Sequence, residues 1–227
     1  MEPSTPGTID PPANVLLVHP SHQEPDACAE LCHDDGSARL KVSFADDDPK
    51  QPYPNEDEQI GFLVVGDVFM EGADGPDFSR PIVTDSVADP TDLSEIGVAV
   101  SRFCKHWDDD GEDIAVCFDS LDALLRHTSP KKVFQFAHVL TKRLSSVDAY
   151  AHFHFDPTHH EDRIVSTFGT IFDAVVADET AEESLPEATD EEVADILSAW
   201  DDEPAIETDP GSITEATDED IADLLGE

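Results

Sequence analysis

Short apolar runs alternate with amphipathic segments along residues 14–177, and this alternation predicts the fold. Apolar runs of four to eight residues between turn signals are typical of buried strands, whereas apolar residues recurring every three or four positions are typical of helices. Strands are predicted at 14–18, 39–44, 60–65, 81–85, 114–118, 149–155 and 171–177. Because these runs are largely apolar and alternate with helices, the pattern predicts a three-layer αβα fold with a mainly parallel sheet.

Helix boundaries are predicted from the residues at the segment ends. Asp89-Pro90-Thr91-Asp92 predicts a start with Asp89 as the capping acid and Pro90 at the first helical position. The apolar stripe of this helix continues to Trp107. A second long helix is predicted after Ser129. Three shorter helices are expected at 24–33, 121–125 and around 163–169, and loops are expected at 45–59 and 69–80.

The last fifty residues differ in character from the rest of the chain. Residues 178–227 contain no lysine, arginine or histidine, and two acidic amphipathic units, 187–200 and 215–227, nearly repeat one another. Each unit is too short to be stable as an isolated helix. The sequence therefore predicts a flexible arm at 1–13, an α/β domain at 14–177 and an acidic tail at 178–227 that is disordered or partly helical.

The charge of the chain is strongly acidic. It carries 53 Asp and Glu against 12 Lys and Arg, a formal net charge of −41 at pH 7. Such a surface repels nucleic acid and anionic membranes, because phosphate binding needs clustered basic residues. Two explanations compete, a disordered acidic protein and a halophilic cytosol in which molar salt shortens the Debye length to about 3 Å. Acids interleaved with well-patterned strands and helices favour the halophile.

Targeting signals and cysteines indicate a cytoplasmic location. The first thirteen residues lack the apolar core of a secretory signal, and no stretch approaches the ~20 apolar residues that span a membrane. The four cysteines are therefore expected to be reduced thiols. Cys28 and Cys32 lie one helical turn apart beside His33 and could form half of a metal site. A second half at matching spacing is missing, so the sequence favours buried structural thiols.

Several blocks of the domain resemble a known group of proteins. They are Asp-Leu-Ser-Glu-Ile-Gly-Val-Ala-Val at 92–100, Val-Cys-Phe-Asp-Ser-Leu-Asp-Ala-Leu-Leu at 116–125, Phe-Ala-His-Val-Leu at 136–140, Ala-His-Phe-His-Phe-Asp-Pro at 151–157 and Ile-Phe-Asp-Ala-Val-Val at 171–176. Together they resemble an uncharacterised haloarchaeal family, a distant branch of the RecA/KaiC-type ATPase superfamily. The resemblance covers roughly residues 14–177 and implies a RecA/KaiC-like fold more strongly than an activity, because members of that family also lack an intact phosphate loop.

The strand at 114–118 ends in Asp119-Ser120, where phosphate-binding α/β domains place a magnesium-binding acid. No glycine-lysine loop precedes it. The first strand instead opens into His19-Pro20, a turn with few backbone N–H donors for a phosphate. Asp119 and Ser120 are therefore interpreted as a vestigial magnesium position without catalysis, and the favoured role of Asp119 is to cap the following helix.

His152, His154, Asp156 and His159 form the richest cluster of candidate metal ligands. His152 and His154 point to the same side of a strand, and Asp156 and His159 lie at its carboxyl end, where α/β sites usually form. The run resembles the zinc-binding segment of metallo-β-lactamase-type hydrolases, but its spacing departs from that pattern and no histidine follows His160. A zinc or nickel site is one interpretation. A histidine cluster satisfied by hydrogen bonds is the favoured one.

Two functions are predicted from these features. The leading hypothesis is a catalytically inactive RecA/KaiC-like regulatory or signalling adaptor, without a cofactor, that recruits a protein partner through the tail. Its contacts would be the apolar tail positions Val193, Ile196, Leu197, Trp200, Ile221, Leu224 and Leu225. The alternative is a nucleotide- or metal-binding ATPase-like enzyme or sensor that uses Asp119 and the histidine cluster, with zinc or magnesium-nucleotide. Assembly into an oligomer is left open.

Overall fold

A seven-stranded sheet forms the centre of the protein. The computed structural model describes residues 4–20, 25–32, 38–45, 59–66 and 75–177, together with 193, 194 and 198. The strands are β1 (Asn14–Val18), β2 (Ala38–Phe44), β3 (Ile60–Val65), β4 (Ile82–Val87), β5 (Ile114–Phe118), β6 (Tyr150–Phe155) and β7 (Ala174–Ala177). Their order is β4-β3-β2-β5-β6-β1-β7, and every pairing is parallel. The predicted parallel sheet is confirmed.

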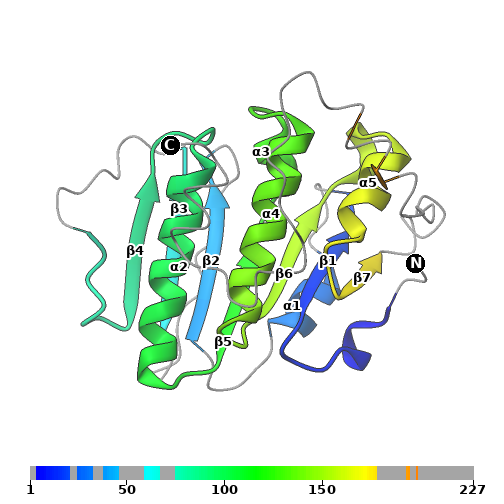
Figure 1. The fold of residues 1–227 in the computed structure, drawn as a ribbon. Helices are drawn as coiled ribbons and strands as arrows, with labels where there is room; N and C mark the ends of the chain where they lie inside the picture. The colour runs from blue at the N-terminus through cyan, green and yellow to red at the C-terminus, as the bar shows by residue number, and fades with distance from the viewer. Residues whose placement is uncertain are drawn as a thin grey trace.

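Helices lie on both faces of this sheet. They are α1 (Asp26–Leu31), α2 (Leu93–Asp110), α3 (Leu121–Leu125), α4 (Pro130–Ser145) and α5 (Asp162–Gly169), with 3-10 turns at Pro6–Thr8 and Pro157–His159. Figure 1 shows α2 and α4 in front of the sheet and α1 behind it. The protein is therefore a three-layer α/β fold.

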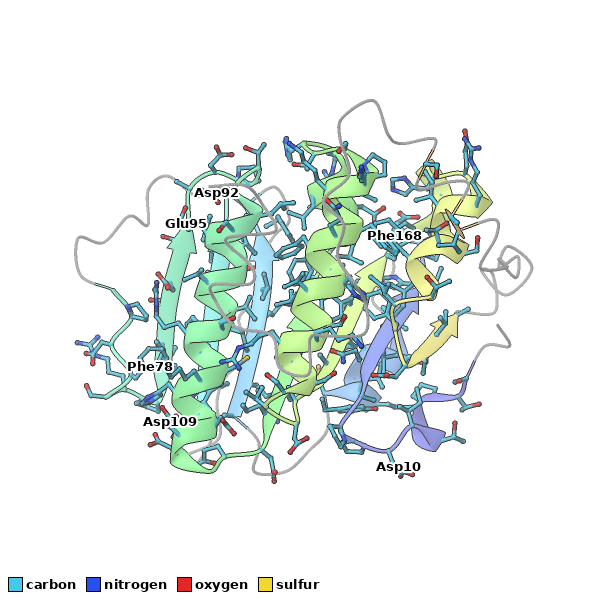
Figure 2. All side chains as sticks on the ribbon, viewed as in Figure 1. Asp10, Phe78, Asp92, Glu95, Asp109 and Phe168 are labelled. Carbon is cyan, nitrogen blue, oxygen red and sulfur yellow. The ribbon has the colours of Figure 1, made fainter. Side chains whose placement is uncertain are left out.

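The two faces of the sheet have different cores. On the face covered by α2, α3, α4 and α5, large aromatic side chains such as Trp107, Phe118 and Phe153 are fully buried. Figure 2 shows Phe168 of α5 on this face, and its ring packs against that of Phe155. On the face covered by α1, the apolar cluster is much smaller and is built around Val15, Leu17, Leu31 and Val176.

Polar residues occupy much of this second face. Because strand side chains alternate between faces, Cys117 points away from the core that contains Phe118. Lys41 of β2 is the register partner of Cys117, and Cys117 is in turn the register partner of His152 on β6. One row across three neighbouring strands thus carries an amine, a thiol and an imidazole beneath α1.

The start of α2 differs from the prediction. The helix begins at Leu93, and its N-cap is Asp92, whose carboxylate accepts a hydrogen bond from the Glu95 amide at 2.8 Å. The prediction that Asp89 caps this helix is therefore wrong. Asp89 instead accepts a hydrogen bond from the Thr91 amide at 2.8 Å, which closes a turn before the helix.

The last strand is shorter than predicted. β7 begins at Ala174 because the residues just before it belong to the turn that ends α5, where the Thr170 and Ile171 amides donate to the carbonyls of Thr167 and Phe168. β4 extends to Val87, beyond the predicted end at residue 85. The predicted loops and the ends of the predicted helix at 24–33 fall partly outside the described residues.

Little of the acidic tail belongs to the described part of the chain. Of the seven predicted contact residues, only Val193 belongs to the described residues, and it is helical and half-buried. The other six lie outside the described residues. Within the described ranges, no helix combines the length and apolarity that a membrane crossing requires.

Candidate metal centre

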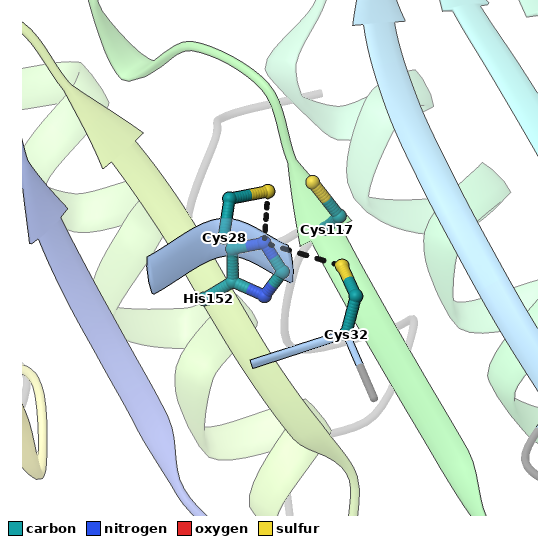
Figure 3. Close-up of side chains that lie close together, drawn as sticks. All are labelled: Cys28, Cys32, Cys117 and His152. Atoms are coloured by element: carbon teal, nitrogen blue, oxygen red, sulfur yellow. Dashed lines mark hydrogen bonds between the residues drawn. The ribbon is translucent and has the colours of Figure 1, made fainter. Parts of the chain in front are cut away.

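Three thiols and one imidazole meet beneath the sheet. Cys28 lies on α1, Cys32 directly follows that helix, Cys117 lies on β5 and His152 lies on β6. Figure 3 shows their side chains converging, with dashed lines from the His152 ring to two of the sulfurs. One ligand atom from each of the four residues lies within 4.8 Å of all the others.

Local structure explains why these four residues converge. Cys28 and Cys32 are spaced i, i+4, which places both side chains on one face of a helical turn. The turn is kept by a hydrogen bond from the Cys32 amide to the Cys28 carbonyl at 3.0 Å. Cys117 and His152 are register partners on neighbouring strands. The centre therefore joins two elements of the sheet to a helix that follows β1.

The imidazole is aimed at the thiols. Nε2 of His152 lies 3.5 Å from Sγ of Cys28 and 3.8 Å from Sγ of Cys32. His152 is only 2% exposed. A buried imidazole needs a polar partner, and here the sulfurs supply it.

The pKa values of the three thiols are shifted in different directions. Hydrogen bonds from Cys117 and Cys28 lower the pKa of Cys32. Hydrogen bonds to Cys28 and Cys32, together with burial, raise the pKa of Cys117 well above its ordinary value. One thiolate is therefore favoured within the cluster, and thiolates are the form in which cysteine binds metals.

A second group of possible ligands shares Cys117 with the first. It consists of Cys117, Asp119 and His154, whose ligand atoms also lie within 4.8 Å of one another. Sγ of Cys117 lies 3.4 Å from Oδ1 of Asp119 and 3.6 Å from Nε2 of His154. The polar side of β5 and β6 thus continues from Cys117 and His152 to the residues two positions further toward the carboxyl ends of the strands.

Two further residues hold this second group in place. Nζ of Lys41 forms an ion pair with Oδ2 of Asp119 at 3.2 Å. Nε2 of His19, just after β1, lies 2.7 Å from Nδ1 of His154, and Nδ1 of His19 lies 3.0 Å from the Pro20 carbonyl oxygen.

Burial governs the charges of this second group. Burial lowers the pKa of His154 well below its ordinary value, and the neighbouring His152 and His19 act in the same direction. Burial raises the pKa of Asp119, although Lys41 opposes that shift. Burial alone would lower the pKa of Lys41, but Asp119 and Cys117 outweigh it and raise the pKa. The Lys41 ammonium is thus stabilised by the anions around it.

A cavity of about 490 Å³ adjoins the first group. Its lining includes all four residues of that group and two cationic side chains, Arg39 and Lys41 of β2. The chain as a whole carries a net charge of −41, so this cavity is more basic than the average of the protein.

The four residues of the predicted histidine cluster lie in different surroundings. His152 and His154 lie on one face of β6, as expected, but they belong to different ligand groups. Asp156 belongs to neither group. Its carboxylate accepts a hydrogen bond from the Thr158 amide at 2.8 Å and caps the 3-10 turn that follows β6. The carboxylate of Asp156 thus has a local structural role in the described residues. Its predicted part in a metal site stays a prediction, because the side chain of His159 lies outside the described part of the chain.

The predicted magnesium position also has a different structure. Ser120, not Asp119, caps α3, because its hydroxyl oxygen accepts a hydrogen bond from the Ala123 amide at 3.0 Å. Asp119 is held on the second face of the sheet by Lys41. The interpretation of Asp119 as a helix cap is therefore wrong, and its carboxylate is available to the ligand groups described above.

Sequence reasoning missed the second half of the Cys28 and Cys32 site. That half is Cys117 and His152, about 85 and 120 residues further along the chain, so no local spacing reveals it. The available signal was strand alternation, which places Cys117 and His152 on the polar side of β5 and β6. The sequence favoured buried structural thiols for Cys28 and Cys32, but both are half-buried and belong to the first ligand group. The fourth cysteine, Cys104, lies in the large core, where burial raises its pKa to about 12.

Comparison with known proteins gives one match. The profile of a family of unknown function, DUF7504, matches residues 12–178. No curated protein and no solved structure matches the chain significantly.

Proposed function

The chain belongs to the DUF7504 family of unknown function, and we propose from the site itself that it is a metal-binding protein with one zinc ion held by Cys28, Cys32, Cys117 and His152. Three thiolates and one imidazole are soft ligands, and a four-coordinate set of this kind favours zinc over magnesium or calcium. The observation that carries the proposal is the convergence of four such ligand atoms from α1, β5 and β6.

The distances fit a single ion. In a tetrahedron with zinc about 2.3 Å from sulfur and about 2.0 Å from nitrogen, each sulfur–nitrogen edge is about 3.5 Å long. The edges from His152 Nε2 to Cys28 Sγ and Cys32 Sγ are 3.5 Å and 3.8 Å. The other four separations between the ligand atoms are each within 4.8 Å, so side-chain shifts would bring the four atoms around one ion.

The ion would fasten α1 to the sheet. This helix has six residues, and Leu31 is its only buried residue. A helix of that length is not stable by itself in water. Structural zinc sites contribute on the order of 10 kcal/mol to folding, so coordination by Cys28 and Cys32 would fix α1 against β5 and β6.

Metal analysis of two matched alanine variants tests this proposal. The full chain, purified under reducing conditions in molar salt, is expected to retain zinc after dialysis. Cys104→Ala removes a buried thiol from the other face of the sheet and should retain zinc, whereas Cys117→Ala should lose it. Full-length protein that stays metal-free after addition of zinc, or a Cys117→Ala variant that retains it, would rule the proposal out.

A regulatory adaptor of the RecA/KaiC type is a second proposal, and the position of Asp119 supports it. The carboxylate is engaged by Lys41 at 3.2 Å on the sheet face. An acid held in this way, without a glycine-lysine loop, suits a protein that does not hydrolyse nucleotide. The tail would then recruit the partner. Proteins captured by the full chain should be lost when Leu197 and Trp200 are both changed to Ala, and unchanged capture would refute the adaptor role.

A further inference from the structure

We propose that a second metal ion binds beside the first, held by Cys117, Asp119 and His154, with the sulfur of Cys117 shared between the two ions. The inference rests on the zinc site proposed above, because that site supplies Cys117 as a thiolate. It adds a centre with a different donor set and with three protein ligands instead of four.

The two separations from the sulfur of Cys117 match those that one ion requires, and the third separation lies within 4.8 Å. A tetrahedral zinc ion with one sulfur and lighter donors at about 2.0–2.1 Å gives edges from the sulfur of about 3.5 Å. The observed separations from Cys117 Sγ are 3.4 Å to Asp119 Oδ1 and 3.6 Å to His154 Nε2. Sulfur, carboxylate oxygen and imidazole nitrogen are all zinc ligands.

A chain of hydrogen bonds turns the lone pair of His154 toward this position. The Pro20 carbonyl can only accept a hydrogen bond, so Nδ1 of His19 carries the proton in the 3.0 Å contact between them. In the tautomer with the proton on Nδ1, Nε2 of His19 is an acceptor, and Nδ1 of His154 lies 2.7 Å from it as the donor. Nε2 of His154 is then left without a proton and faces Cys117. Metal-bound histidines are oriented by such a second hydrogen bond.

Lys41 orients the carboxylate in a comparable way. Its ammonium binds Oδ2 of Asp119, while Oδ1 is the oxygen near Cys117. A carboxylate can bind a metal through one oxygen and a cationic donor through the other, and ligating carboxylates commonly have such a partner. The side chain of Asp119 is 20% exposed, so little water competes for it.

The charges at the two positions can accommodate a second divalent ion together with an anionic fourth ligand. One zinc ion with three thiolates has a net charge of −1, and the charges of Asp119 and Lys41 cancel one another. Buried net charge is costly unless it is compensated. A second divalent ion changes the total to +1, and an anionic fourth ligand such as hydroxide would make the whole centre neutral.

The second ion differs from the first because the described residues give it three donors rather than four. Three protein ligands with one position left for water is the arrangement of zinc sites that bind exchangeable ligands. The ligand class that fits is a water molecule or a small anion, because the Lys41 ammonium stands beside Asp119. Lys41 and Cys117 also line the cavity of about 490 Å³ that adjoins the first group.

Zinc titration of the reduced, metal-free full chain against a chromophoric chelator tests this inference. The wild-type chain should take up two equivalents. Asp119→Asn, which keeps the side-chain shape, and His154→Gln should each weaken the second equivalent by about 100-fold or more and leave the first within about tenfold. His138→Gln, in a half-buried histidine of α4, is the matched control and should take up two equivalents.

The outcomes separate the two proposals. One equivalent in the wild-type chain and in both variants would refute the second ion while leaving the first zinc site intact. No uptake by the wild-type chain would refute both. Two equivalents retained in Asp119→Asn and His154→Gln would show that a second ion binds elsewhere, which overturns the assignment to Cys117, Asp119 and His154.

Discussion

Cys117 of β5 and His152 of β6 are register partners on adjacent parallel strands, and both side chains point toward α1. Their separation is therefore fixed by the hydrogen bonds of the sheet. The other two ligands, Cys28 and Cys32, depend on a helix of six residues. Half of the centre is thus preorganised by the sheet, and the other half depends on the docking of α1.

Binding of the first zinc ion is expected to release about two protons at neutral pH. The pKa of Cys117 is raised well above its ordinary value and that of Cys28 is raised to about 12, whereas the pKa of Cys32 is lowered. Two of the three thiols therefore carry protons that zinc must displace. Affinity should rise by about 100-fold per pH unit as long as both thiols stay protonated in the metal-free chain.

Calorimetry in buffers of different ionisation enthalpy measures this release. The slope of the observed enthalpy against the buffer enthalpy gives the number of protons. A slope near zero would mean that the thiols are already ionised in the metal-free protein. Cys104→Ala serves as the control and should leave the slope unchanged, because Cys104 is not a ligand.

The two ends of α2 should respond oppositely to loss of an aspartate. Figure 2 shows Asp92 at the start of the helix and Asp109 near its end. Asp92→Ala removes the cap on the Glu95 amide and should lower the free energy of unfolding by about 1 kcal/mol. Asp109→Ala removes a negative charge from the last turn of the helix. This substitution should raise the free energy of unfolding by about 0.3–1 kcal/mol at low ionic strength.

Salt separates these two effects in chemical denaturation. The cap is a hydrogen bond and should persist in molar salt, whereas the charge–dipole effect is screened. If Asp92→Ala and Asp109→Ala lowered the free energy of unfolding equally, the assignment of Asp92 as the N-cap would be contradicted.

The strands of the sheet were predictable from sequence because the signal for each one lies within its own few residues. Each strand is a short apolar run, and β1, β3 and β5 have the predicted bounds. The start of α2 was less predictable, since Asp89 and Asp92 are both capping residue types. Only the tertiary structure shows that Asp92 accepts the helical hydrogen bond while Asp89 closes the preceding turn.

The metal centre was only half predictable for a different reason. The pairing of Cys28 with Cys32 is visible as a helical spacing, but their partners depend on strand order. β5 and β6 become neighbours through the long α4 connection, and α1 covers them although it follows β1. Lys41 and His19 could not be recognised either, because their roles exist only once Asp119 and His154 are in place.

At Gly61, β3 lies directly against two aromatic rings of α2. A Cβ atom added to Gly61 would lie 2.8 Å from ring atoms of both Phe103 and Trp107. Both rings are fully buried and have no room to move. Gly61→Ala should therefore lower the free energy of unfolding by about 1–3 kcal/mol in urea denaturation.

Gly169→Ala is the control for this substitution. Gly169 ends α5, and its added Cβ would meet Val175 Cγ2 at 3.5 Å, an ordinary contact. The free energy of unfolding of the Gly169→Ala variant should stay the same or rise slightly, because alanine restricts the unfolded chain more than glycine does. Equal destabilisation of both variants would show that β3 and α2 are not packed as closely as described.

Salt should stabilise the whole domain, because the net charge of −41 is distributed over one chain. Repulsion between carboxylates acts over about 10 Å at 0.1 M salt but over only about 3 Å at 1 M. The free energy of unfolding should therefore rise steeply across this range of KCl and then level off. Sucrose at matched osmolality is the control, since it favours compact states without screening charge. A protein equally stable at both salt concentrations would contradict the halophilic interpretation of its acidity.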